Sequence, residues 1–133
     1  MKKYTHIALK VVLSLVLIFP VLGILGIFPA PTADMYNTPE AFNFITMLST
    51  AGYINYIMAI VNILALIALW TKREALAAIL ILPITVNIVG FHAFLDGGLF
   101  TGGAMLANLL LLLNLYFIWK NRDKYQSLLN PSR

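Results

Sequence analysis

The stretch ALAAILILPITVNIVGFHAFL at residues 75–95 contains no Asp, Glu, Lys or Arg, and it decides the fold class. An α-helix needs about 20 apolar residues to cross the roughly 30 Å hydrocarbon core of a bilayer. Lipid offers no partners to free backbone N–H and C=O groups, so a segment that crosses it must be helical. The stretch therefore predicts one transmembrane helix.

Three further runs without charged residues lie at residues 11–28, 51–70 and 97–119. The chain is 61% hydrophobic and only 11% charged, with a mean hydropathy of +0.89, whereas about a quarter of the residues in soluble domains are charged. We predict an all-α polytopic membrane protein, a four-transmembrane-helix bundle forming a single membrane domain over residues 1–133. The helices are expected at about 6–28, 51–70, 75–95 and 103–120.

The first run follows Met1-Lys2-Lys3 and could instead be a secretory signal peptide. Its apolar core is longer than a typical signal sequence, and its exit offers no clear cleavage site. We therefore expect the first helix to be retained.

The basic residues indicate the orientation. All nine lie before or at the start of the first helix, between the second and third, or after the fourth: Lys2, Lys3, Lys10, Lys72, Arg73, Lys120, Arg122, Lys124 and Arg133. The other two loops contain three acids, Asp34, Glu40 and Asp96, and no cation. The positive-inside rule then predicts a multi-pass protein of the cytoplasmic membrane with cytoplasmic N- and C-termini. The net charge of +4 thus reflects contact with the lipid bilayer, and no nucleic-acid partner is expected.

The first outer loop contains a helix-start pattern, Thr38-Pro39-Glu40, with Thr as N-cap, Pro at the first position and an acid near the positive end of the helix dipole. Apolar residues then recur at helical spacing. We predict a short interfacial helix at about 39–49, followed by a turn at Gly52. The alternative is that the helix at 51–70 begins early and tilts.

Five polar residues within the apolar helices are candidates for ligand binding: His92, Asp96, Asn87, Asn55 and Asn62. His92 and Asp96 are four residues apart, so they share a helix face and can form a hydrogen bond or ion pair. Asn55 and Asn62 also share a face, whereas Asn87 lies about 140° around the helix from His92 and should meet a different neighbour. We expect a polar seam between the second and third helices, open towards the outer face, with Asp96 accessible to water.

A structural role is the alternative for these residues. Asn side chains between transmembrane helices often only form hydrogen bonds across the interface, and the His92–Asp96 pair can equally be functional or structural. His6, next to the basic N-terminus, is expected at the inner headgroups. The chain has no cysteine, metal-binding cluster, flavin motif or nucleophile triad, so we expect no independent catalytic activity, no metal and no intrinsic cofactor.

The segment PITVNIVGFHAFLD, residues 83–96, resembles the third helix of DoxX-type membrane proteins, and NLYFIWKNRDKYQSLL, residues 114–129, is similar to the end of their fourth helix and the tail that follows. The matching positions are Pro83, Asn87, His92 and Asp96. The resemblance implies a small four-helix bundle, in some members a subunit linked to thiosulfate:quinone oxidoreduction or to other membrane redox complexes. One departure is Asn62, where relatives commonly carry an acid, and it puts proton-coupled or redox chemistry in doubt.

Two classes of function follow. In the first, the protein is a quinone-linked subunit of a membrane redox complex, in which His92 donates to one quinone oxygen and Asn55 or Asn62 binds the other. Asp96 then orients His92 or relays a proton. In the second, it is a non-enzymatic assembly subunit or a binder of a lipid or small hydrophobic molecule. The expected partner is a membrane redox protein in the first class and a second copy of the chain in the second.

Overall fold

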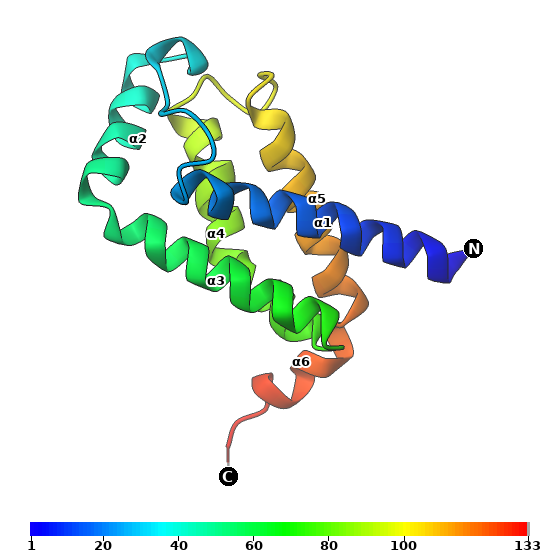
Figure 1. Ribbon diagram of the computed structural model, residues 1–133. Coiled ribbons are helices and arrows are strands. Elements are labelled where there is room, and N and C mark those ends of the chain that lie inside the picture. The colour runs from blue at the N-terminus through cyan, green and yellow to red at the C-terminus, as the bar shows by residue number, and fades with distance from the viewer. Residues whose placement is uncertain (133) are drawn as a thin grey trace.

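The computed structural model describes residues 1–132, and within them it contains helices and no β-strand (Figure 1). The elements in chain order are α1 (Lys2–Ile24), the 3₁₀ turn η1 (Ala33–Met35), α2 (Pro39–Ala51), α3 (Tyr53–Trp70), α4 (Glu74–Phe94), α5 (Ala104–Lys120) and α6 (Arg122–Leu129). The all-α class predicted from the sequence is confirmed.

Three helices, α1, α3 and α4, are long and apolar enough to cross a membrane. The fourth predicted span, α5, has 17 residues and reaches the required length only together with α6, from which it is separated by a bend of 71°. The structure therefore contains three or four candidate spans, as expected of a membrane protein.

Packing centres on α4, which lies between α3 and α5, while α1 lies against both α3 and α5 (Figure 1). The core combines large side chains from all four helices, Leu17, Leu69, Ile81 and Phe117 among them, each at most 2% exposed. Alanines in α3 and α4 complete this core, and small residues of this kind let membrane helices approach closely.

The outside of the helices is also apolar. Leu15 on α1, Ile67 on α3 and Leu112 on α5 are between 56% and 66% exposed. Soluble monomers rarely expose apolar surface on every side, whereas a lipid environment requires it. The distribution of apolar side chains is consistent with a protein surrounded by lipid.

The predicted outer helix is present as α2. The Thr38 hydroxyl accepts a hydrogen bond from the Ala41 backbone N–H at 3.1 Å, and the helix begins at Pro39 as predicted. It extends two residues beyond the predicted end, to Ala51, and Gly52, with φ +73°, separates it from α3. The alternative of one continuous helix is wrong.

The first helix is shifted from its prediction. We expected residues 6–28, but α1 begins at Lys2 and ends at Ile24. Gly26 adopts φ +77°, a left-handed conformation that terminates helices, although the residues after it, Ile27 and Phe28, are as apolar as those before. The apolar run continues past the end of the helix, so a prediction based on hydropathy placed the boundary too late.

Candidate functional site

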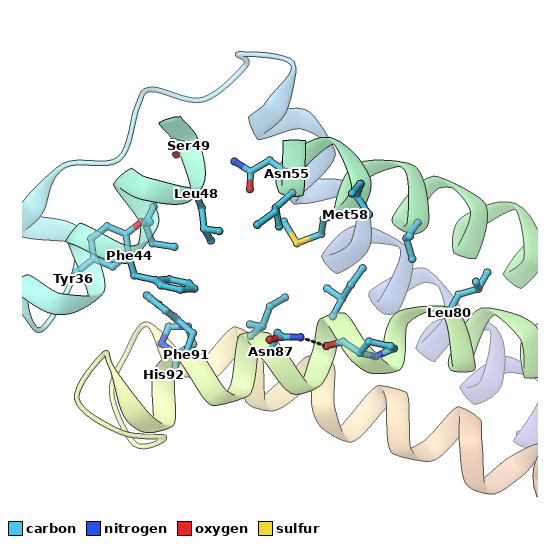
Figure 2. Close-up of a pocket in the computed structure, with 17 residues that line it drawn as sticks. Tyr36, Phe44, Leu48, Ser49, Asn55, Met58, Leu80, Asn87, Phe91 and His92 are labelled. Atoms are coloured by element: carbon cyan, nitrogen blue, oxygen red, sulfur yellow. Dashed lines mark hydrogen bonds between the residues drawn. The ribbon is translucent and has the colours of Figure 1, made fainter. Parts of the chain in front are cut away.

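A cavity of about 700 Å³ lies between α2, α3 and α4 (Figure 2). One wall comes from α2 through Phe44 and Leu48, the opposite wall from α3 through Met58, and the floor from α4. Because Ile57 and Asn87 in its lining remain exposed, the cavity opens to the outside of the molecule. Small-molecule sites typically have volumes of about 300–1,000 Å³, so the space suits a ligand of that size.

The lining is mainly apolar. Twelve of its seventeen residues are hydrophobic: Phe44, Ile45, Leu48, Ile54, Ile57, Met58, Val61, Leu80, Pro83, Ile84, Ile88 and Phe91. The polar ones are Tyr36, Ser49, Asn55, Asn87 and His92. Four of these polar residues lie towards the end formed by α2, the start of α3 and the end of α4, whereas Leu80 lines the far end (Figure 2). The cavity is therefore amphipathic along its length.

His92 is held by Asp96, as the spacing of four residues predicted. The His92 Nδ1 lies 3.0 Å from Oδ2 of Asp96. The other carboxylate oxygen, Oδ1, accepts the backbone N–H of Asn37 at 2.8 Å, and the Asn37 side-chain amide donates to the Asp96 backbone carbonyl at 3.1 Å. The pair thus belongs to a three-residue cluster that ties the end of α4 to the loop before α2.

The expectation that Asp96 is accessible to water is wrong. Asp96 is 1% exposed, because the Asn37 segment lies directly over it. The prediction treated the end of α4 as an open interface and did not include the loop that covers it. Asp96 therefore faces His92 and Asn37 from a buried position and does not line the cavity.

The turn after α4 is shaped by its glycines. Gly97 and Gly98 have φ of +84° and +106°, and the Gly98 N–H donates to the His92 carbonyl at 2.8 Å. A side chain at Gly97 would place its Cβ 3.2 Å from Cβ of Asn37. Thr38, next to Asn37, donates its hydroxyl to the Leu95 carbonyl. Glycine is required here both for the left-handed backbone and for the close approach of the loop.

Asn55 and Asn87 line the cavity from α3 and α4 (Figure 2). Asn87 donates its amide to the Pro83 carbonyl one turn earlier at 2.8 Å, and it is exposed. Asn55 is half-buried, and within residues 1–132 its amide has no protein partner. We had expected Asn87 and His92 to meet different neighbours, but both line the same cavity, which is wide enough to extend around α4.

Asn62 also does not line the cavity. It is 2% exposed and donates its amide to the Leu17 carbonyl of α1 at 3.1 Å. Asn62 therefore does not belong to the polar seam that we predicted between α3 and α4. The face of α3 that lines the cavity at Asn55 packs against α1 at Asn62. Asn114 similarly donates to the Ala78 carbonyl at 2.9 Å, so both asparagines connect helices.

Aromatic residues near His92 were not among the sequence candidates. The ring of Phe91 lies 5.0 Å from His92, 6.2 Å from Tyr36 and 5.8 Å from Phe44 between centroids. Burial, and secondarily the negative charge of Asp96, raise the pKa of the Tyr36 phenol above its usual value. The contact between Tyr36 and Phe91 could not be predicted from sequence spacing, because Tyr36 follows η1 and Phe91 belongs to α4.

A second polar cluster, also missed, lies at the opposite end of the molecule. Oε1 of Glu74, the first residue of α4, lies 2.8 Å from the His6 Nε2 and 3.3 Å from the Lys10 Nζ. The other His6 ring nitrogen lies 3.2 Å from the hydroxyl of Tyr116 on α5. His6, expected at the inner headgroups, connects α1 to α4 and α5 through these contacts. The basic segments 2–10, 72–73 and 120–124 lie at this end, because Lys10 contacts Glu74 and Tyr125 donates to the Ala75 carbonyl.

Comparison with known proteins finds no protein-family model, no curated protein and no solved structure that matches this chain. The resemblance to DoxX-type proteins stays a prediction from the two motifs described above.

Proposed function

We propose that the chain is a four-span protein of the cytoplasmic membrane that binds one amphipathic small molecule in the cavity between α2, α3 and α4. The observation that carries the proposal is the cavity itself. Its volume of about 700 Å³, its apolar walls and the polar groups towards one end suit a molecule with a small polar head and an apolar body.

The proposed orientation places both termini in the cytoplasm and the His92 end of the cavity in the outer leaflet. It is supported by the position of the basic segments 2–10, 72–73 and 120–124, which lie at the His6–Glu74 end of α4, whereas the Asn37–Asp96 cluster lies at its other end. Cations concentrate on the cytoplasmic side of membrane proteins. The four spans are α1, α3, α4 and α5.

Reporter fusions test this topology. A fusion after Arg133 should report the cytoplasm, and one within residues 33–37 should report the exterior. An exterior C-terminus would refute the orientation and would move the cavity to the inner leaflet.

Quinones are one class of molecule with the required shape, and the resemblance to DoxX-type proteins favours a quinone-linked role. The hydroquinone form of such a molecule would place one hydroxyl at His92 and its other oxygen at the free amide of Asn55, in place of the donation from His92 expected from the sequence. Asn62 was the other residue considered for the second oxygen. Its amide donates to the Leu17 carbonyl of α1, so it is not proposed as a ligand residue. A small-headed lipid fits the same walls, and its binding would make the chain a lipid-binding or assembly subunit.

A photoreactive alkyl probe tests the binding role. Purified protein in lipid nanodiscs is labelled with a diazirine-bearing decyl benzoquinone and, separately, with a diazirine-bearing diacylglycerol, and the labelled peptides are identified by mass spectrometry. We expect labelling within α2–α4 by at least one probe, and the more efficient probe distinguishes the two ligand classes.

The matched variants are Met58→Trp, which fills the cavity, and Leu112→Trp, which adds the same side chain on the exposed outside of α5. Met58→Trp should abolish the labelling of α2–α4, and Leu112→Trp should leave it unchanged. Labelling spread evenly over all helices, or unaffected by Met58→Trp, would refute the binding role.

A further inference from the structure

We infer that the ligand of this cavity presents a neutral hydroxyl group, as a hydrogen-bond donor, to Nε2 of His92. The inference rests on the binding role proposed above and specifies the chemistry of the head group. It follows from which ring nitrogen of His92 carries the hydrogen, from how firmly Asp96 is held, and from the charge around the cavity.

The first step is the tautomer. Nδ1 of His92 lies 3.0 Å from Oδ2 of Asp96, and an ionised carboxylate can only accept hydrogen bonds. Nδ1 therefore carries the hydrogen. The inference assigns the neutral form to the His92 imidazole, which has one N–H, so Nε2 is left with a lone pair and acts as an acceptor. Within residues 1–132, Nε2 of His92 has no protein partner, whereas both ring nitrogens of His6 do.

The second step is that Asp96 is held in one orientation, so its two carboxylate oxygens cannot exchange their partners. Its Oδ1 accepts the Asn37 backbone N–H at 2.8 Å, and its own carbonyl accepts the Asn37 side-chain amide at 3.1 Å. With Asp96 only 1% exposed, water does not compete for the carboxylate. Backbone groups fixed by the fold thus hold Oδ2 towards His92 and maintain the tautomer.

The third step is charge. The cavity is lined by no lysine, arginine, aspartate or glutamate among residues 1–132, and the carboxylate of Asp96 lies behind His92. A phosphate or carboxylate head group would lose its hydration without gaining a cation, and it would face the Asp96 charge. An ammonium head group would lose its hydration among apolar walls without contacting a carboxylate. A neutral hydroxyl carries neither cost.

The aromatic rings beside His92 favour a hydroxyl on a flat ring. Phe91 lies nearly perpendicular to His92, at 75°, and also nearly perpendicular to Tyr36, at 89°. Aromatic groups prefer such edge-to-face or offset neighbours. A phenolic ring can extend this cluster while its alkyl chain lies along Met58 and Leu80.

Two probes that differ by one methyl group test the inference. 4-Nonylphenol donates a hydrogen bond, and its methyl ether, 4-nonylanisole, does not. In equilibrium dialysis against wild-type protein in nanodiscs, corrected for partitioning into empty nanodiscs, we expect the phenol to bind about tenfold more tightly, the effect of one hydrogen bond in a partly dry site. In His92→Phe, which keeps a ring in place, both probes should bind equally.

The outcomes separate the two proposals. Equal binding of both probes by wild type would overturn the hydroxyl inference and leave the binding role intact. Binding of neither probe would overturn both. Binding of both probes with the tenfold preference retained in His92→Phe would assign the preference to another residue and overturn the inference.

Asp96→Asn gives a second test that depends on the tautomer alone. Because the side-chain oxygen stays with the Asn37 N–H, the new amide NH₂ faces Nδ1 of His92, and the ring hydrogen moves to Nε2. The preference for the phenol should then fall to within about twofold, since both probes can accept from an Nε2–H.

Nitrogen-15 NMR of the imidazoles reads the tautomer without a ligand. The His92 signals, assigned by their loss in His92→Phe, should show Nδ1–H in wild type and Nε2–H in Asp96→Asn. Wild-type protein with the hydrogen on Nε2 would overturn the inference even if the variants fold poorly.

Discussion

Replacing Asp96 with alanine should detach the outer loop from the end of α4. The substitution removes the charged acceptor of two hydrogen bonds, one from the Asn37 backbone N–H at 2.8 Å and one from His92 Nδ1 at 3.0 Å. A hydrogen bond to a charged group contributes about 1.5–3 kcal/mol, so the loss of two of them costs about 3–6 kcal/mol. We expect the free energy of unfolding to fall by about 3–6 kcal/mol.

Two measurements check this result. Unfolding in mixed micelles with increasing denaturing detergent gives the change in stability, and hydrogen exchange of the Asn37 amide reports the local contact. The Asn37 amide should exchange at a rate near that of an unprotected loop in the variant, while amides in the middle of α4 remain protected. The loss is local because the core around Ile81 and Phe117 does not include Asp96.

Asp34→Ala is the matched control, because it removes an exposed acid from the same loop. The Asp34 carboxylate accepts the Thr32 hydroxyl and the backbone N–H of Asp34, which lower its pKa, and its removal should change neither stability nor the exchange of Asn37. If Asp96→Ala also left both quantities unchanged, the three-residue cluster would not hold the loop, and the argument for a fixed His92 tautomer would fail with it.

Three further predictions concern other parts of the fold. Thr38→Ala removes both the N-cap of α2 and the hydroxyl bond to the Leu95 carbonyl, so it should cost about 1–2 kcal/mol, measured by the same unfolding assay, with Thr38→Ser restoring most of it. Phe117→Ala empties the centre of the core, where the ring is fully buried, and should cost about 3–5 kcal/mol; a loss below about 1 kcal/mol would show that the four helices do not pack around this ring. Stability should fall at alkaline pH because burial disfavours the Tyr36 phenolate: the contribution is complete below the unfolded pKa of about 10 and is lost as the pH rises through the higher folded pKa. Tyr36→Phe should flatten that alkaline decline, and an unchanged pH profile of unfolding between pH 9 and 12 would contradict the assignment.

Local signals in the sequence predicted the elements they control. Thr38-Pro39-Glu40 placed the start of α2 at the correct residue, because an N-cap acts on N–H groups only two or three positions away. Gly52 marked the break before α3 for a similar reason. The end of α1 was missed because hydropathy reports compatibility with lipid, whereas the helix ends where the backbone turns at Gly26.

The candidate site was predictable only where one helix determines it. His92 and Asp96 meet because residues four apart share a face. Asn37, the third member, contributes a backbone N–H from 59 residues away, and a backbone group has no signature in the sequence. The orientation of Asn62 towards α1 depends on how α3 is rotated against its neighbours, which the packing of the whole molecule decides.

In the proposed four-span arrangement, the bend between α5 and α6 bears on the thickness of the bilayer around the protein. At about 1.5 Å per residue, the 17 residues of α5 extend about 25 Å, while the 21 residues of α4 extend about 31 Å and the 23 of α1 about 34 Å. An ordinary hydrocarbon core is about 30 Å thick, so in this arrangement lipids beside α5 would have to compress, while those beside α1 and α4 would not. Such a mismatch costs fractions of a kcal/mol per Å and is relieved in thin membranes or beside another short helix. Lipid chain length should therefore influence the distribution of the protein among membranes mainly through the lipids that contact α5.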